Sequence, residues 1–168
     1  EKLKRVLAKI LRHRDPSIPP RRPDPRPGKE VAKQWRKPHI YTPANVRHML
    51  DIARSYPSPR APLRPLSIYT MLLLAYCAGL RRSELARLDL GDVDLRGGTI
   101  TIRQTKFYKT RILPLPDSVM AELRAYIDAR RRAGGSHDPS SGLFWHEQRS
   151  ARYTKQAVAW LLVDVIRR

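Results

Sequence analysis

The chain has 168 residues, of which 34 are lysine or arginine and 15 are aspartate or glutamate, giving a net charge of +19. A protein this basic usually binds a polyanion; nucleic acid is the expected partner, and an anionic membrane is the weaker alternative because no basic amphipathic helix with an aromatic face stands out. The single cysteine excludes an internal disulfide and a cysteine-rich zinc cluster, and the sequence shows no secretory signal and no apolar run long enough to span a bilayer.

The first part of the chain is expected to be a short helix followed by a linker. Residues 1–14 place apolar side chains at helical spacing, with basic residues on the opposite face. Residues 15–39 include six prolines from Pro16 to Pro27, and proline, which lacks the amide N–H, does not fit a helix interior. This basic linker is either a solvated tether or a segment that runs along DNA.

A compact region is expected to begin near Ile40, with three helices in succession. Thr42 and Pro43 form a helix-start signal, with threonine as the N-cap and proline at the first helical position. A buried helix is predicted from Leu66 to Ala78 and a shorter one from Ser83 to Leu88, separated by a turn at Gly79. The one cysteine, Cys77, lies inside the apolar run and is expected to be a small buried residue.

The hydrophobic period then changes from helical to alternating. Short strands are predicted around residues 93–95, 99–105 and 111–115, with turns at Gly97-Gly98 and at residues 107–110. These strands predict a small three-stranded antiparallel sheet, so the fold class is α+β and mainly helical.

Two more helices complete the predicted fold. Asp117 is expected to cap the first, whose apolar face and basic C-terminus are formed by Val119, Leu123, Tyr126, Ile127 and the triplet Arg130-Arg131-Arg132. The triplet is interpreted as a helix cap rather than a binding site, because cations suit the C-terminal end of the helix dipole. Thr154 is expected to cap the last helix, over residues 155–167.

Three stretches resemble the tyrosine recombinases of the phage integrase family. They are HIYTPANVRHML (39–50), AGLRRSELARLDLGDVDL (78–95) and TKFYKTRILPL (105–115). The second and third resemble the two signature boxes of the family, in the right order, and the resemblance covers about residues 40–166. It implies the catalytic-domain fold of that family.

The resemblance also implies a reaction. The family cleaves DNA by attack of a tyrosine hydroxyl on a backbone phosphate, which leaves a 3′-phosphotyrosyl bond and a free 5′-hydroxyl without ATP, metal or other cofactor. Arg81 matches the first catalytic arginine, and its planar guanidinium suits the non-bridging phosphate oxygens. Lys106 matches the hairpin lysine, which as a general acid protonates the departing 5′-oxygen.

Other interpretations of these residues remain open. Arg81 could be a helix-cap arginine paired with Glu84, which is otherwise expected to orient the arginine turn. Lys106 could be a plain turn lysine, with Lys109 as the functional one. Four further basic residues are expected to contact DNA phosphates: Arg82 in the arginine turn, and Arg103, Lys109 and Arg111 in the hairpin. Arg82 could instead be a residue that only faces solvent.

The resemblance further implies residues that the chain lacks. The family completes its site with a His-x-x-Arg box, a further histidine or tryptophan, and the tyrosine nucleophile, all after a helix like 155–167. His146 and Arg149 have the box spacing, but they precede that helix, as does Tyr153, and both candidates are rejected. The chain as given is therefore expected not to cleave DNA, and to be either a piece of a longer protein or a truncated gene product.

The expected organisation has three parts. Residues 1–14 end an N-terminal DNA-clamping (core-binding) domain, residues 15–39 form the linker, and residues 40–168 are a catalytic domain incomplete at its C-terminus. The resemblance implies double-stranded DNA as partner, a homo-tetrameric synaptic complex, and a bacterial or phage-encoded protein of the cytoplasm. The alternatives are a non-catalytic DNA-binding remnant of an integrase and, more remotely, a basic structural protein of a nucleoprotein particle.

Overall fold

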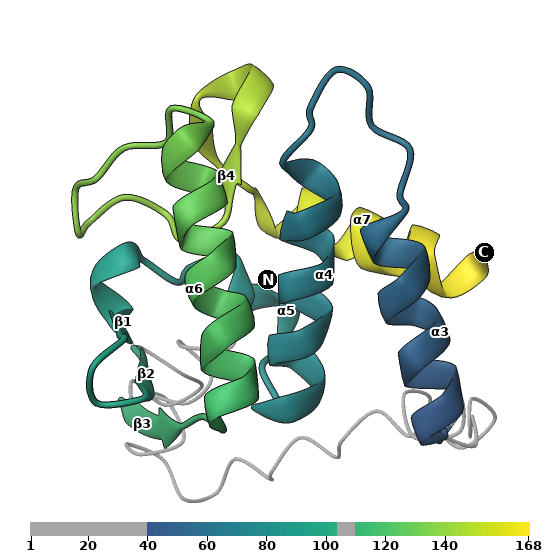
Figure 1. Cartoon of the computed structure of the whole chain (residues 1–168), viewed down its shortest axis with the longest axis horizontal. Helices are drawn as coiled ribbons and strands as arrows, with labels where there is room; N and C mark the ends of the chain where they lie inside the picture. The colour runs from purple at the N-terminus through teal and green to yellow at the C-terminus, as the bar shows by residue number, and fades with distance from the viewer. Residues whose placement is uncertain (1–39, 104–109) are drawn as a thin grey trace, which may run out of the picture. The chain divides into compact units, whose positions relative to one another are not determined.

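The computed structural model describes residues 40–103 and 110–168, and Tyr41–Arg168 form one compact unit. Figure 1 shows the order of helices and strands along the chain. The elements are α3 (Pro43–Arg54), α4 (Arg64–Cys77), α5 (Arg82–Leu85), η1 (Leu90–Asp92), β1 (Val93–Asp94), β2 (Thr99–Ile102), β3 (Arg111–Pro114), α6 (Asp117–Arg132), β4 (Trp145–His146), η2 (Glu147–Arg149), β5 (Ala151–Arg152) and α7 (Lys155–Arg167). The predicted fold class, mainly helical with a small antiparallel sheet, is confirmed.

Helix α4 is the centre of the helical part, with α3 and α6 on either side (Figure 1). Its residues Ile68, Met71 and Leu74 are fully buried, and α7 contacts α3, α4 and α5. Burial of such side chains contributes about 2 kcal/mol each relative to exposure. No helix in the two described ranges is both long and apolar enough to pass through a membrane.

Side-chain caps start two of the helices where the sequence predicts them. Thr42 Oγ1 accepts from the N–H of Asn45 at 3.2 Å, and Asn45 Oδ1 accepts from the N–H of Thr42 at 3.0 Å. Thr154 Oγ1 likewise accepts from the N–H of Ala157 at 3.1 Å. The prediction for Asp117 is wrong: Pro116 is the N-cap, and Asp117 is the first residue of α6, where its negative charge suits the helix N-terminus.

The end of α4 differs from the prediction. Gly79 adopts the left-handed conformation (φ +62°) expected after a helix, but Tyr76 and Cys77 are exposed. Cys77 is therefore not a buried residue. Tyr76 and Cys77 each lie only about 20° around the helix from a residue seven positions earlier, Tyr69 and Thr70, and both of those are buried. The packing that covers these sides of α4 therefore ends before its last turn.

The three-stranded antiparallel sheet has the order β1-β2-β3, as predicted. Ile100 pairs with Leu113 and Ile102 with Arg111, and both isoleucines are buried, as alternation along a strand requires. A second, two-stranded sheet of β4 and β5 was not predicted.

The three arginines at the end of α6 do not all have the same role. Arg131 and Arg132 are exposed, as a helix cap would be. Arg130 is only 2% exposed, and its guanidinium donates to the carbonyls of Ser136 and Gly142 and to Ser141 Oγ. Burial lowers the pKa of Arg130. This side chain holds the loop after α6 in place.

One face of α7 is left apolar and exposed. Trp160 is 63% exposed, and Val163 and Ile166 are each 44% exposed. The opposite face buries Val158, Leu161 and Val165.

Candidate functional site

The Arg81 turn is built by three consecutive residues. Gly79 reverses the chain in the left-handed conformation, Leu80 enters the core at 5% exposure, and Arg81 follows as the extended N-cap of α5. The Arg81 side chain is 62% exposed. The backbone is thus anchored while the guanidinium reaches solvent.

A single buried carboxylate organises this turn. Glu84 is 3% exposed; its Oε2 accepts from the backbone N–H of Arg81 at 2.9 Å, and its Oε1 accepts from Arg81 Nη1 at 3.1 Å. Glu84 Oε2 also accepts from Arg111 Nη2, at 2.9 Å. The pairing of Arg81 with Glu84 is therefore present, and the structure brings Arg81 and Arg111 together on one carboxylate.

The other predicted site residues are placed differently. Arg103 Nε donates to Oδ1 of the buried Asp92 at 2.6 Å, which raises the pKa of Arg103, although the side chain stays 64% exposed. Arg82 is exposed on α5. Lys106 and Lys109 lie outside the described residues.

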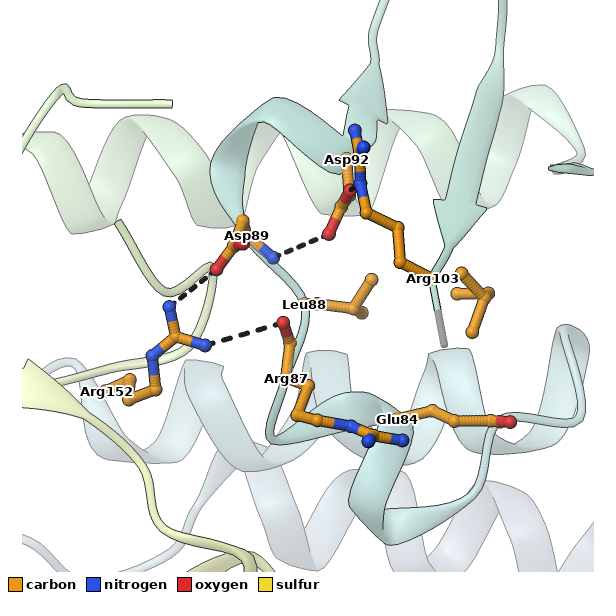
Figure 2. A pocket seen from close by; sticks show the side chains of 8 residues that line it. Glu84, Arg87, Leu88, Asp89, Asp92, Arg103 and Arg152 are labelled. Carbon is orange, nitrogen blue, oxygen red and sulfur yellow. Dashed lines mark hydrogen bonds and ion pairs between the residues drawn. The ribbon is translucent and has the colours of Figure 1, made fainter. Parts of the chain in front are cut away.

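A polar cavity of about 220 Å³ lies between α5, η1, β2 and β5 (Figure 2). Two ion pairs border it, Arg103 with Asp92 and Arg152 Nη2 with Asp89 Oδ1, each at 2.6 Å. The lining residues are Glu84, Arg87, Leu88, Asp89, Asp92, Ile102, Arg103 and Arg152.

Sequence reasoning missed four of these cavity residues as members of a site: Arg87, Asp89, Asp92 and Arg152. Arg87 and the two aspartates lie within the second resembling stretch, so the sequence offered them for consideration. Arg152 carries no local signal, because 63 residues separate it from Asp89. Its position is fixed by the unpredicted pairing of β4 with β5.

The rejected candidates lie on and beside that second sheet. The Tyr153 ring is buried, its centroid 5.0 Å from that of His146, and burial raises the pKa of Tyr153. Arg149 is exposed in η2. Over residues 40–103 and 110–168, no group of three or more His, Cys, Asp or Glu side chains is placed to hold a metal ion.

A family model matches the part of the chain that contains this site. Residues 40–164, which include the Arg81 turn, the cavity and both sheets, match the model of the phage integrase family. The chain belongs to the phage integrase family.

Two relatives illustrate the similarity in sequence. The protein y4gA of Sinorhizobium fredii (strain NBRC 101917 / NGR234) is 81% identical over 120 residues, which are 71% of this chain and 64% of y4gA. The tyrosine recombinase XerC of Roseiflexus sp. (strain RS-1) is 33% identical over 128 residues, 75% of this chain and 39% of that protein. The chain thus spans less than two thirds of either relative.

Solved structures of phage integrase relatives have the same fold. XerA recombinase superposes with a TM-score of 0.63 at 22% identity, covering 89% of this chain and 45% of XerA. A lambda integrase (75–356) dimer bound to a COC′ core site gives a TM-score of 0.52 at 14% identity, covering 82% of this chain and 47% of the integrase. At these identities the likeness establishes the catalytic-domain fold.

Proposed function

We propose that this chain is part of a site-specific DNA recombinase or integrase that cleaves and rejoins DNA through a 3′-phosphotyrosyl intermediate. The observation that carries the proposal is the Arg81 turn. The Arg81 side chain is 62% exposed, while the buried Glu84 carboxylate binds both its backbone N–H and one of its side-chain nitrogens.

This arrangement suits the stabilisation of a phosphate that gains negative charge. Arg81 uses Nη1 to bind Glu84, so its outward N–H groups can donate to the non-bridging oxygens of a phosphodiester. Arginine keeps its proton at every physiological pH, and one preorganised donor of this kind lowers a barrier by about 3 kcal/mol. Arg81 is accordingly proposed as a catalytic residue.

The roles proposed for the other site residues rest on their resemblance to the family motifs. Lys106 is proposed as the general acid that protonates the leaving 5′-oxygen. Arg82, Arg103, Lys109 and Arg111 are proposed to contact DNA phosphates; the exposure of Arg82 and Arg103 supports this for two of them. The tyrosine nucleophile is proposed to lie outside this chain.

The proposed organisation of the protein also extends beyond the matched region. Residues 1–14 would end a DNA-clamping domain, residues 15–39 would link it, and residues 40–168 would form a catalytic domain without its last segments. The complete protein would act in the cytoplasm on double-stranded DNA, as a homo-tetramer in the synaptic complex.

The test begins with the DNA that follows the codon for Arg168. An open frame encoding a His-x-x-Arg box and a downstream tyrosine supports the recombinase, whereas an immediate stop codon supports a DNA-binding remnant without cleavage. The extended protein is then incubated with nicked duplexes carrying a site selected from a random library by binding. A covalent protein–DNA adduct is expected, and Arg81→Ala should abolish it; full adduct yield in that variant would remove Arg81 from the site.

A further inference from the structure

We infer that Arg111 is a positioning residue, which sets how much of the Arg81 guanidinium is left for a phosphate. The inference rests on the proposed function of Arg81. It goes beyond a role for Arg111 as a DNA contact, because Arg111 would act through Glu84 on another side chain.

The hydrogen bonds of Glu84 show a competition between two arginines. A carboxylate binds a guanidinium best through two parallel bonds, one to each oxygen. Here Oε1 takes Arg81 Nη1, but Oε2 is shared by the Arg81 backbone N–H and by Arg111 Nη2, at 2.9 Å each. The Arg81 side chain is consequently held by one bond instead of two and stays 62% exposed.

The charges of the cluster favour an added anion. Two guanidinium groups share one carboxylate that is 2% exposed at its side chain, so one positive charge at this place is not balanced within the trio. A phosphate oxygen at Arg81 would balance it. The Arg111 side chain is 37% exposed, and its buried Nε has no hydrogen-bond partner among the described residues, so Arg111 is the more enclosed of the two cations.

The backbone position of Arg111 makes it suited to this role. It is the first residue of β3 and pairs with Ile102 of β2, which is 2% exposed. The sheet therefore holds Arg111 from one side while Glu84 of α5 holds it from the other. Without the Arg111 side chain, Glu84 Oε2 becomes available to Arg81, whose guanidinium would rotate inward to form the bidentate pair.

The first arm of the test uses the 168-residue chain and needs no cleavage. Arginine side chains are labelled with ¹⁵N, and the Arg81 Nε–H signal is assigned by its loss in Arg81→Lys. We expect Arg111→Met to shift this signal, and Glu84→Gln to remove the response to Arg111→Met. The control Arg131→Met removes the same charge from an exposed pair with Asp128 and should leave the signal in place.

An Arg81 signal that is the same with and without the Arg111 side chain would overturn the inference. If the methionine variant does not fold, Arg111→Lys gives the same readout, because it keeps the charge but cannot present the planar guanidinium to Glu84. Its Arg81 signal should also move, and an unmoved signal counts against the inference.

The second arm uses the extended protein and the covalent adduct. Arg111→Met should lower the adduct-forming rate at saturating DNA by up to about 100-fold, because the Arg81 guanidinium is displaced from its position, with little change in the half-saturating DNA concentration. An unchanged rate with weaker DNA binding would show a phosphate contact only and would overturn the inference. If no variant, including the wild type, forms an adduct, the proposed function fails while the NMR arm still decides the role of Arg111.

Discussion

Arg103 donates through Nε to Oδ1 of Asp92 at 2.6 Å, and this contact mirrors the bond from Arg111 to Glu84. Arg103 follows β2 and Arg111 begins β3, so each flank of the segment between these strands is tied to a buried carboxylate of the preceding stretch. Asp92 Oδ2 also accepts from the N–H of Asp89 at 3.0 Å. The ion pairs thus fasten the three-stranded sheet to the region that presents Arg81.

Glu84→Gln should destabilise the fold and loosen the Arg81 turn. The neutral amide keeps the shape but loses the charge that three donors share, and a hydrogen bond to a buried charged group contributes about 2 kcal/mol. The measurement is the free energy of unfolding in urea. Glu122→Gln is the control, because it removes an ion pair with Arg54 that is shorter but largely exposed, and it should lower the free energy of unfolding by less than about 1 kcal/mol. If both variants lowered the free energy of unfolding equally, the organising role of Glu84 would be contradicted.

Arg82→Ala should weaken DNA binding in a salt-dependent way. A side chain that neutralises one phosphate releases roughly one counterion, so the slope of log K against log salt concentration should decrease by about 1. Arg131→Ala carries the same charge change on the exposed end of α6 and should leave the slope nearly unchanged. Identical slopes for wild type and Arg82→Ala would exclude Arg82 from the DNA contact.

Gly79→Ala should destabilise the chain by about 1 kcal/mol, because a residue with a Cβ is strained in the left-handed conformation found there. Gly79→Asn should lower the stability by less, since asparagine tolerates this conformation better than alanine does. Thermal unfolding of the three proteins gives the order directly. An alanine variant as stable as the wild type would mean that the turn before Arg81 adopts another conformation.

Stability should fall on mild acidification, in part because of His146. Burial, reinforced by Arg64 and Arg149, lowers the pKa of His146 below its ordinary value of 6.5. The unfolded chain then binds the proton more tightly than the folded chain, so the free energy of unfolding decreases as the pH falls through 6.5 and below. His146→Gln should flatten this dependence in urea titrations at pH 7.5 and about pH 5.5.

The control for this pH effect is His137→Gln, at an exposed position after α6. Of the two histidines, only a change at His146 is expected to flatten the dependence of the free energy of unfolding on pH. A pH dependence that persists in full in His146→Gln would assign the effect to other groups.

Local signals made much of this fold predictable. Thr42 and Thr154 each cap a helix through a residue three positions on, and strand alternation with Gly97-Gly98 identified the sheet. Such features depend on neighbouring residues only, so they are visible in the sequence. The pairing of Arg81 with Glu84, three residues apart, was accessible for the same reason.

The remaining features depend on contacts across the chain. Arg152 reaches Asp89 over 63 residues, and Arg130 is buried because the loop after α6 folds back over its guanidinium. Cys77 is exposed although Thr70, seven residues earlier on the same side of α4, is buried, because the packing on this side ends before the last turn of the helix. The spacing of apolar residues predicts which face of a helix is apolar, but it does not predict which residues of that face the other helices and loops cover.

The exposed indole of Trp160 gives the molecule an intrinsic optical reporter. The structure describes two of the three tryptophans of the sequence, and the other described one, Trp145, is only 9% exposed, so these two rings should differ in emission wavelength and in access to iodide. A polypeptide segment that packs on the outer face of α7 would displace water from Trp160 and shift its fluorescence to the blue. In a Trp35→Phe variant, which removes the emission of the third tryptophan, assembly at this helix can therefore be followed in real time without attaching a dye.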